Sequence, residues 1–141
     1  MARSAGTVRR MTLEREAAGR LLRTAWIEGV GRHHTGAPRA RALEGWEELA
    51  SWERDSSCTV AEQIAQLVVA ANGRTSRLTR AQRGQFVATC WIAQVHRHLS
   101  EPQVSSITPW EEMPDWQRQT VAHVFDVIEQ AVIEQGADAG S

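Results

Sequence analysis

Two segments of this chain are related to each other, and each of the six tryptophans has a counterpart in the other segment. Residues 24–33 (TAWIEGVGRH) match residues 89–98 (TCWIAQVHRH) at an offset of 65. Residues 46–54 (WEELASWER) match residues 110–118 (WEEMPDWQR) at an offset of 64. The matched tryptophans are Trp26 with Trp91, Trp46 with Trp110, and Trp52 with Trp116. Because two copies are too few for a solenoid, the duplication predicts one closed, pseudo-symmetric domain whose function lies where the halves meet.

Apolar residues recur at helical spacing in both segments, and no stretch alternates with the period of two that is typical of strands. We expect the first helix to run over residues 12–32 and its counterpart to begin at Thr79, because Thr79 and Gln82 have the spacing of a capping box. The second helix of each copy follows the tryptophan-rich block, where Pro114 and Asp115 favour a helix start in the second copy. The sequence therefore predicts an all-α fold, a pseudo-twofold duplicated helix-loop-helix with four main helices in a compact bundle.

Both copies are expected to form one domain, because a chain of 141 residues can bury roughly two thirds of its unfolded surface without a metal or a disulfide. The expected organisation is a flexible basic arm at 1–11, repeat 1 at 12–72, a linker at 73–78, repeat 2 at 79–135 and a flexible tail at 136–141. The two cysteines do not make a disulfide framework, and the sequence shows no signal peptide and no long apolar run. We therefore expect a cytoplasmic protein with no membrane partner.

Charge alternates along the chain in step with the repeat. Residues 1–43 and 73–100 are rich in arginine, whereas residues 44–72 and 101–141 are rich in aspartate and glutamate. One interpretation is that the two halves of each copy complement each other's charge across helix pairs at the surface. The other is that the two basic halves converge around an anion. Both interpretations can hold at once.

The tryptophan-rich blocks resemble a known family. Residues 109–118 read PWEEMPDWQR. They resemble a block in bacterial members of the ryanodine-receptor repeat (RyR-like) family, which consists of Pro-Trp, acidic residues, a proline, an acidic residue and Trp-Gln-Arg, and which precedes the second helix. GWEELASWER at residues 45–54 is a degraded version of it, and the TAWI and TCWI segments match the place of a helix tryptophan in tandem RyR repeats of the animal channels. This resemblance, to the bacterial and phage type, implies a binding module from a signalling or defence system.

The resemblance also implies a ligand. Tandem RyR repeats are associated with adenine-nucleotide binding between the two copies, with the purine held between one tryptophan from each, here Trp26 and Trp91. Two facing indoles would each add about 1–3 kcal/mol of stacking, and arginine forks onto phosphate oxygens with paired hydrogen bonds. The candidate ligand-binding residues are Trp26, Trp91, Arg32, Arg97, Arg23, His33 and His98, with the linker residues Arg74 and Arg77 behind them.

Structural roles stay open for the same residues. Trp26 and Trp91 lie on apolar helical stripes, which also fits a place in the core. The tryptophans of the two tryptophan-rich blocks fit staples that hold a loop onto the bundle. Arg32 and Arg97 fit the last turns of their helices, where a cation meets exposed carbonyls, and the matched histidines fit ordinary polar caps of the bundle.

Metal and catalytic sites are not indicated. His33 with His34, and His96 with His98, have no cysteine or carboxylate partners at zinc-site spacing, and no nucleophile elbow or phosphate-binding glycine loop is present. We therefore expect no metal, no cofactor and no catalysis. The predicted function is non-catalytic binding of an adenine nucleotide or nucleotide-derived messenger in the cleft between the repeats, for sensing or sequestration. The alternative is a protein-interaction or nucleic-acid-binding adaptor that uses the basic first helices and the arm at residues 1–11.

Overall fold

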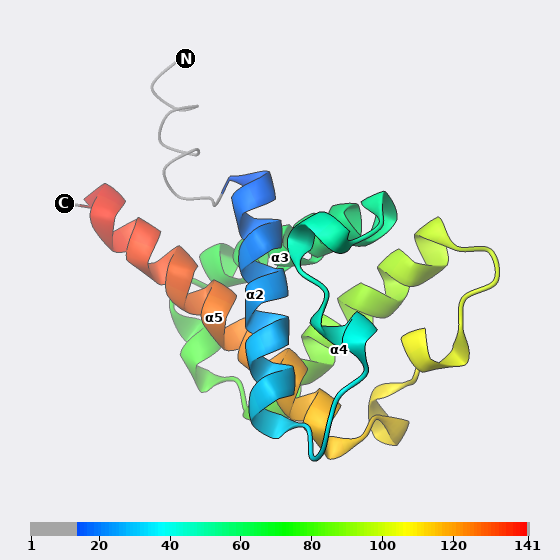
Figure 1. Cartoon of the computed structure of the whole chain (residues 1–141). Coiled ribbons are helices and arrows are strands. Elements are labelled where there is room, and N and C mark those ends of the chain that lie inside the picture. The colour runs from blue at the N-terminus through cyan, green and yellow to red at the C-terminus, as the bar shows by residue number, and fades with distance from the viewer. Residues whose placement is uncertain (1–13, 141) are drawn as a thin grey trace.

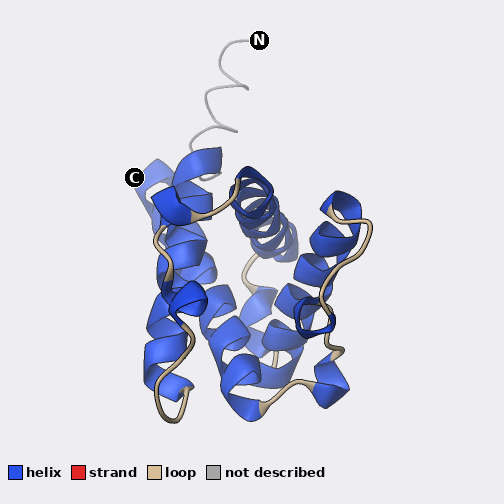
Figure 2. Ribbon diagram, turned by 45° about the vertical axis from the view of Figure 1, so that its right-hand side comes forward, coloured by secondary structure: helices blue, strands red, loops and turns tan. Residues whose placement is uncertain are grey.

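Four long helices account for most of residues 14–140, the part of the chain that the computed structural model describes. They are α2 (Arg15–His33), α3 (Ser51–Ala71), α4 (Arg80–His98) and α5 (Asp115–Gly140). Short 3-10 helices lie in the connections: η1 (Ala40–Leu43), η2 (Trp46–Glu48), η3 (Arg74–Arg77), η4 (Val104–Ser106) and η5 (Trp110–Glu112). Figure 2 shows these helices joined by loops, with no strand among the described residues, which confirms the all-α prediction. The arm predicted at residues 1–11 lies outside the described residues.

The elements occur twice, in the same order and at the offsets of the sequence repeat. α4 begins and ends 65 residues after α2, and η5 begins and ends 64 residues after η2. α3 and α5 also begin 64 residues apart, each shortly after a Trp-Glu-Glu turn. The duplicated helix-loop-helix fold is therefore confirmed, with α2 and α3 in repeat 1 and α4 and α5 in repeat 2. The difference of one residue between the offsets falls in the loop that follows α2 and α4.

Local chemistry decides where the first helix of each repeat begins. The Glu14 carboxylate accepts hydrogen bonds of 2.9 and 3.1 Å from two backbone N–H groups of the first turn of α2, so this helix begins at Arg15 rather than at residue 12. Thr79 and Gln82 form the predicted capping box at the start of α4, with reciprocal hydrogen bonds of 2.8 and 3.1 Å. Both helices therefore start at a side chain that satisfies free backbone donors.

α5 is longer than the repeat predicts. It continues through Gly136 to Gly140, so the described part of the segment expected as a flexible tail is helical, and Ser141 lies outside the described residues. A glycine inside a helix costs about 1 kcal/mol relative to alanine, which is too little to end a helix of 26 residues. None of the helices in the described part of the chain is long and apolar enough to cross a membrane.

The four helices pack so that α5 touches each of the others. α2 packs extensively on α3 and α5, α4 packs mainly on α5 and less on α3, and α2 and α4 make no extensive contact with each other (Figure 1). The repeats therefore meet in two matched contacts, α2 with α5 and α3 with α4, and also where α3 packs on α5. The core lies between the four helices, and its largest fully buried apolar side chains are Phe125, Ile64, Ile128, Val30, Val60, Val95 and Val124.

A glycine in the first helix of each repeat makes room for an indole. A Cβ atom added at Gly19 would lie 2.8 Å from Cη2 of Trp46, and one added at Gly84 would lie 2.7 Å from the same atom of Trp110. No real Cβ atom approaches a neighbour so closely, so only glycine lets each tryptophan lie against the helix. The structure thus gives Trp46 and Trp110 the role of loop staples, and Gly19 and Gly84 occupy matched positions of the repeat.

Candidate functional site

Trp26 and Trp91 lie in different contacts between the repeats. The Trp26 indole packs edge-on against Trp116, with ring centroids 6.4 Å apart and planes at 61°, and its Nε1 donates to the carbonyl of Ala42 at 3.1 Å. The Trp91 indole lies 6.2 Å from that of Trp52, with planes tilted by 37°. The structure therefore does not bring Trp26 and Trp91 together across a shared cleft. Both are half-buried and pack against the hydrophobic core, as their structural interpretation predicts.

Arg23 holds a loop rather than reaching into open space. Its guanidinium donates to the carbonyl of Glu44 at 2.8 Å and to the carbonyls of Arg41 and Ala42 at 3.3 Å. Burial is the main cause that lowers its pKa. Arg23 therefore fixes the α2–α3 connection onto α2, and its counterpart in repeat 2 is an alanine, Ala88.

Arg32 and Arg97 occupy equivalent exposed positions on the last turns of α2 and α4. Neither makes an ion pair with another residue of the described chain. A cation at this place is favoured by the exposed carbonyls of a helix C-terminus. Their guanidinium groups are therefore exposed, at the ends of two helices that make no extensive contact with each other.

Many arginines of the basic segments pair with carboxylates of the acidic segments. In repeat 1, Arg15 binds the carboxylates of Asp55, at 2.6 Å, and of Glu62. In repeat 2, Arg80 lies 3.1 Å from Asp126, and Arg83 lies 3.0 Å from Asp126 and 2.5 Å from Glu129. Charge complementation within each repeat is thus what the structure shows for these arginines. It leaves less free positive charge on α2 and α4 than the sequence pattern alone indicates.

A shallow hollow of about 200 Å³ lies where α4 and α5 begin. Its lining residues are Arg80, Ala81, Trp110, Asp115, Arg118 and Gln119, and we call it the α4–α5 hollow. The Arg118 guanidinium lies 5.1 Å from the centre of the Trp110 ring, and it donates to the carbonyls of Trp110 at 3.0 Å and Glu111 at 2.8 Å. Arg80 donates to the side chain of Gln119 at 2.5 Å. The hollow therefore combines an aromatic wall with two guanidinium groups held in place.

The end of α2, from repeat 1, lies beside the start of α5, from repeat 2. The imidazole of His34 packs edge-on against Trp116 at 4.7 Å between ring centroids. Burial first, and then the charges of Arg80 and Arg32, lower the pKa of His33. Its Nε2 atom is buried and has no hydrogen-bond partner among the described residues. His33 does not line the hollow, and it is His34 that contacts repeat 2, at Trp116.

The equivalent place in the α3–α4 contact is already occupied by a carboxylate. His98, the counterpart of His33, has its Nε2 3.2 Å from Oδ2 of Asp55. Arg15, the counterpart of Arg80, donates to Oδ1 of the same carboxylate at 2.6 Å. His98 also lies near Trp52, with ring centroids 6.3 Å apart. Of the candidates predicted from the sequence, Trp91 and His98 therefore share this contact, and Trp26 and His33 share the other.

Sequence reasoning missed the hollow because it assigned Trp110 and Trp116 to packing and did not single out Arg80 or Arg118. The block at residues 109–118 contains both Trp110 and Arg118, but no spacing along the chain indicates that Arg80 lies beside them. Within the described residues, no group of three histidine, cysteine, aspartate or glutamate side chains is arranged to hold a metal ion.

Comparisons of the chain with family models, with curated proteins and with solved structures find no match. The resemblance to RyR-like repeats stays a prediction from the residues quoted above. The fold class stands on the helices themselves.

Proposed function

We propose that this protein is a non-catalytic binding module for an adenine nucleotide or a nucleotide-derived messenger. The ligand binds at the α4–α5 hollow, where the end of α2 from repeat 1 meets repeat 2. The observation that carries the proposal is the presence of one indole and two guanidinium groups, those of Trp110, Arg118 and Arg80, in the lining of a single hollow.

Each of these groups suits one part of a nucleotide. An indole offers a flat apolar surface, and contact with a base contributes about 1–3 kcal/mol. A guanidinium group presents paired N–H donors that match phosphate oxygens. Arg118 is already ordered by two carbonyls and by the Trp110 ring, so binding costs little additional side-chain entropy at this residue.

The size of the hollow limits what it holds. Sites that enclose a drug-sized ligand measure about 300–1,000 Å³, whereas this hollow measures about 200 Å³. It therefore takes one part of a nucleotide, and the remainder lies over the neighbouring surface toward the exposed Arg32 at the end of α2. The resemblance to RyR-like repeats implies the same ligand class, held there by residues equivalent to Trp26 and Trp91.

The adaptor alternative depends on free positive charge along the first helices. Arg15 and Arg83 are each engaged with two carboxylates of their own repeat, which leaves less free positive charge along these helices for a nucleic acid. Salt distinguishes the two. Nucleic acid held through many phosphates dissociates steeply as salt rises, whereas a mononucleotide held by two arginines depends on salt much less.

The test is a thermal-shift screen followed by calorimetry with ATP, cyclic AMP, ADP-ribose and adenosine. A ligand that binds only the native state raises the melting temperature. Arg118→Gln should weaken binding of the phosphorylated ligands at least tenfold. Arg54→Gln, the equivalent change in repeat 1, serves as the matched control and should leave binding unchanged. The proposal is wrong if none of these adenine compounds binds, or if both variants bind as the parent protein does.

A further inference from the structure

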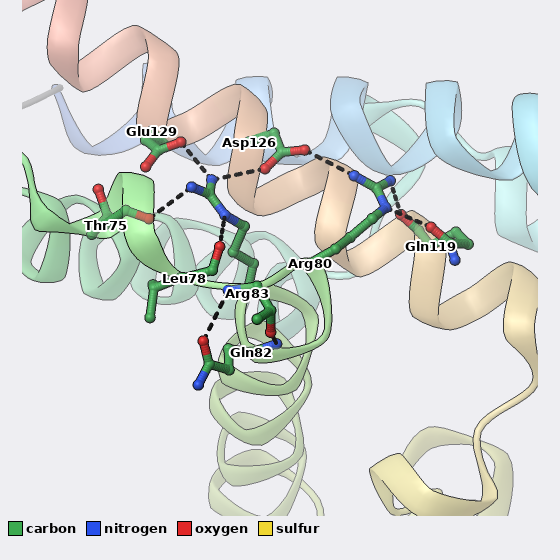
Figure 3. Close-up of polar contacts among 9 residues, drawn as sticks. Thr75, Leu78, Arg80, Gln82, Arg83, Gln119, Asp126 and Glu129 are labelled. Atoms are coloured by element: carbon green, nitrogen blue, oxygen red, sulfur yellow. Dashed lines mark hydrogen bonds and ion pairs between the residues drawn. The ribbon is translucent and has the colours of Figure 1, made fainter.

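The two contacts between the repeats differ in charge at one matched position. In the α3–α4 contact the position is Asp55, whose carboxylate is shared by Arg15 at 2.6 Å and His98 at 3.2 Å. In the α2–α5 contact the matched residue is Gln119, a neutral amide. Its side-chain oxygen accepts from Nε of Arg80 at 2.5 Å, and its backbone carbonyl accepts from the same guanidinium at 3.3 Å (Figure 3). The arginine is thus held in a similar place without the carboxylate.

Arg80 keeps one carboxylate partner, and it shares that partner. Asp126 lies between the two guanidinium groups, 3.1 Å from Arg80 and 3.0 Å from Arg83 (Figure 3). Within the described residues, Arg118, across the hollow, is bound only by carbonyls and by the Trp110 ring. Asp115 also lines the hollow and makes no ion pair with either of its arginines in the described chain. Arg80 and Arg83 together face two carboxylates, those of Asp126 and Glu129, so Arg118 is the cation of the hollow that the described carboxylates leave unpaired.

Donor groups remain unused on both cations. A guanidinium has five N–H donors, and Arg80 uses three of them while Arg118 uses two. The matched histidines do not distinguish the two contacts, because the buried Nε2 atoms of His33 and His98 both lack a hydrogen bond in the described chain, although that of His98 lies 3.2 Å from Asp55. The unused donors of the two arginines match the oxygens of a phosphoryl group, which offers more acceptors than a carboxylate does.

We propose that the α4–α5 hollow is a phosphate site, in which a phosphoryl group binds between Arg80 and Arg118, beside the neutral Gln119 whose counterpart in the other contact is the carboxylate of Asp55. This inference rests on the proposed function, because it assigns the phosphate end of the nucleotide to the hollow and makes Gln119 the residue that leaves the site open. Burial is the main cause that lowers the pKa of His33; the charges of Arg80, Arg32 and His123 lower it further, and Asp115 raises it. A bound phosphate offsets the charge of Arg80. Phosphate binding is therefore coupled to a rise in the pKa of His33.

The experiment titrates the full-length protein with inorganic phosphate, followed by calorimetry and by the imidazole resonances of His33. Saturable binding of one phosphate with an upward shift of the His33 pKa is expected. Gln119→Asp copies the arrangement of repeat 1 and fills the site with a tethered carboxylate, so it should weaken phosphate binding at least tenfold without lowering the melting temperature. Gln119→Glu, whose longer side chain also carries the charge, should weaken it too, whereas Gln119→Asn should retain binding.

Asp55→Gln makes the converse change in repeat 1 and should create a second phosphate site per chain. Unchanged phosphate binding in a folded Gln119→Asp protein overturns the inference, as does the absence of saturable phosphate binding to the parent protein. The two proposals fail separately. If inorganic phosphate binds as tightly as any adenine nucleotide does, the phosphate site is supported and the nucleotide function is contradicted. If adenine nucleotides and adenosine bind with equal affinity, and Gln119→Asp does not change that affinity, the nucleotide function is supported and the phosphate site is contradicted.

Discussion

The indole of Trp26, on the first helix of repeat 1, packs edge-on against that of Trp116, on the last helix of repeat 2, with ring centroids 6.4 Å apart. The matched pair, Trp91 with Trp52, lies at 6.2 Å in the other contact between the repeats. Each of these four tryptophans therefore joins one repeat to the other. These two pairs help to hold the repeats together, whereas Trp46 and Trp110 pack on the first helix of their own repeat.

The two contacts are not equally close. A Cβ atom added at Gly29 would lie 2.8 Å from Cγ2 and 3.1 Å from Cα of Thr120, so α2 touches the backbone of α5. The matched residues in the α3–α4 contact are Gln94 and Ser56, both buried, whose side-chain oxygens have no hydrogen-bond partner in the described chain. Glutamine in place of glycine keeps α4 from packing on α3 as extensively as α2 packs on α5.

Gly29→Ala should lower the free energy of unfolding by about 1–3 kcal/mol, because the new methyl group has no room against Thr120. Gly31→Ala is the matched control two residues further along α2, where a Cβ atom would meet nothing within 4 Å. It should raise the free energy of unfolding by about 0.5–1 kcal/mol, since alanine is the better helix former. Urea unfolding measures both, and equal effects of the two substitutions would contradict the close α2–α5 contact.

Trp26→Ala and Trp116→Ala should each lower the free energy of unfolding by about 3 kcal/mol. This is the lower end of the range for truncating a large aromatic side chain, because both indoles are half-buried. Their effects should not add. A double-mutant cycle should give a coupling energy of about 0.5–1.5 kcal/mol, as expected for an aromatic pair in contact. The pair Trp26→Ala with Trp91→Ala serves as the control, because these indoles do not meet, and its effects should add within error.

Arg83 and Glu129 form an ion pair whose side chains are 12% and 13% exposed, and the matched residues of repeat 1 are the buried alanines Ala18 and Ala65. Arg83→Ala alone should cost about 3 kcal/mol in urea unfolding, because it leaves a carboxylate largely buried without its partner. The double substitution Arg83→Ala with Glu129→Ala copies repeat 1 and should cost less than the single one. Arg20→Ala removes exposed ion pairs and a guanidinium that lies 5.5 Å from the centre of the Trp46 ring, and it should change stability by about 1 kcal/mol or less.

Cys90 should react slowly in the native state. Burial raises the pKa of its thiol from about 9 to about 11, so at pH 8 the reactive thiolate is roughly a hundredfold scarcer than in the unfolded chain. The rate of maleimide labelling in a Cys58→Ala background checks this. The raised pKa also means that the folded state holds the proton more tightly, so stability present below pH 9 is lost as pH rises toward 11. Cys90→Ala, which copies Ala25 of repeat 1, should remove that loss.

The secondary structure and the duplication were predictable from the sequence because they depend on short-range chemistry. The capping box of Thr79 and Gln82 acts within one helical turn, and the Trp-Glu-Glu turns precede the second helices at a constant spacing. Gly19 and Gly84 also lie at matched positions of the repeat. Their contacts with Trp46 and Trp110 could not be predicted, because each indole comes from a distant part of the chain.

Tertiary structure alone decided which residues meet. The expectation that Trp26 faces Trp91 assumed that symmetry-related residues lie together, but a twofold axis brings together only residues close to it. Here α2 and α4 both pack on α3 and α5 and not extensively on each other, so each indole meets a tryptophan that is not its own counterpart. The same packing sets the end of α2 beside the start of α5 and forms the hollow at Arg80, Trp110 and Arg118, which no spacing along the chain indicates.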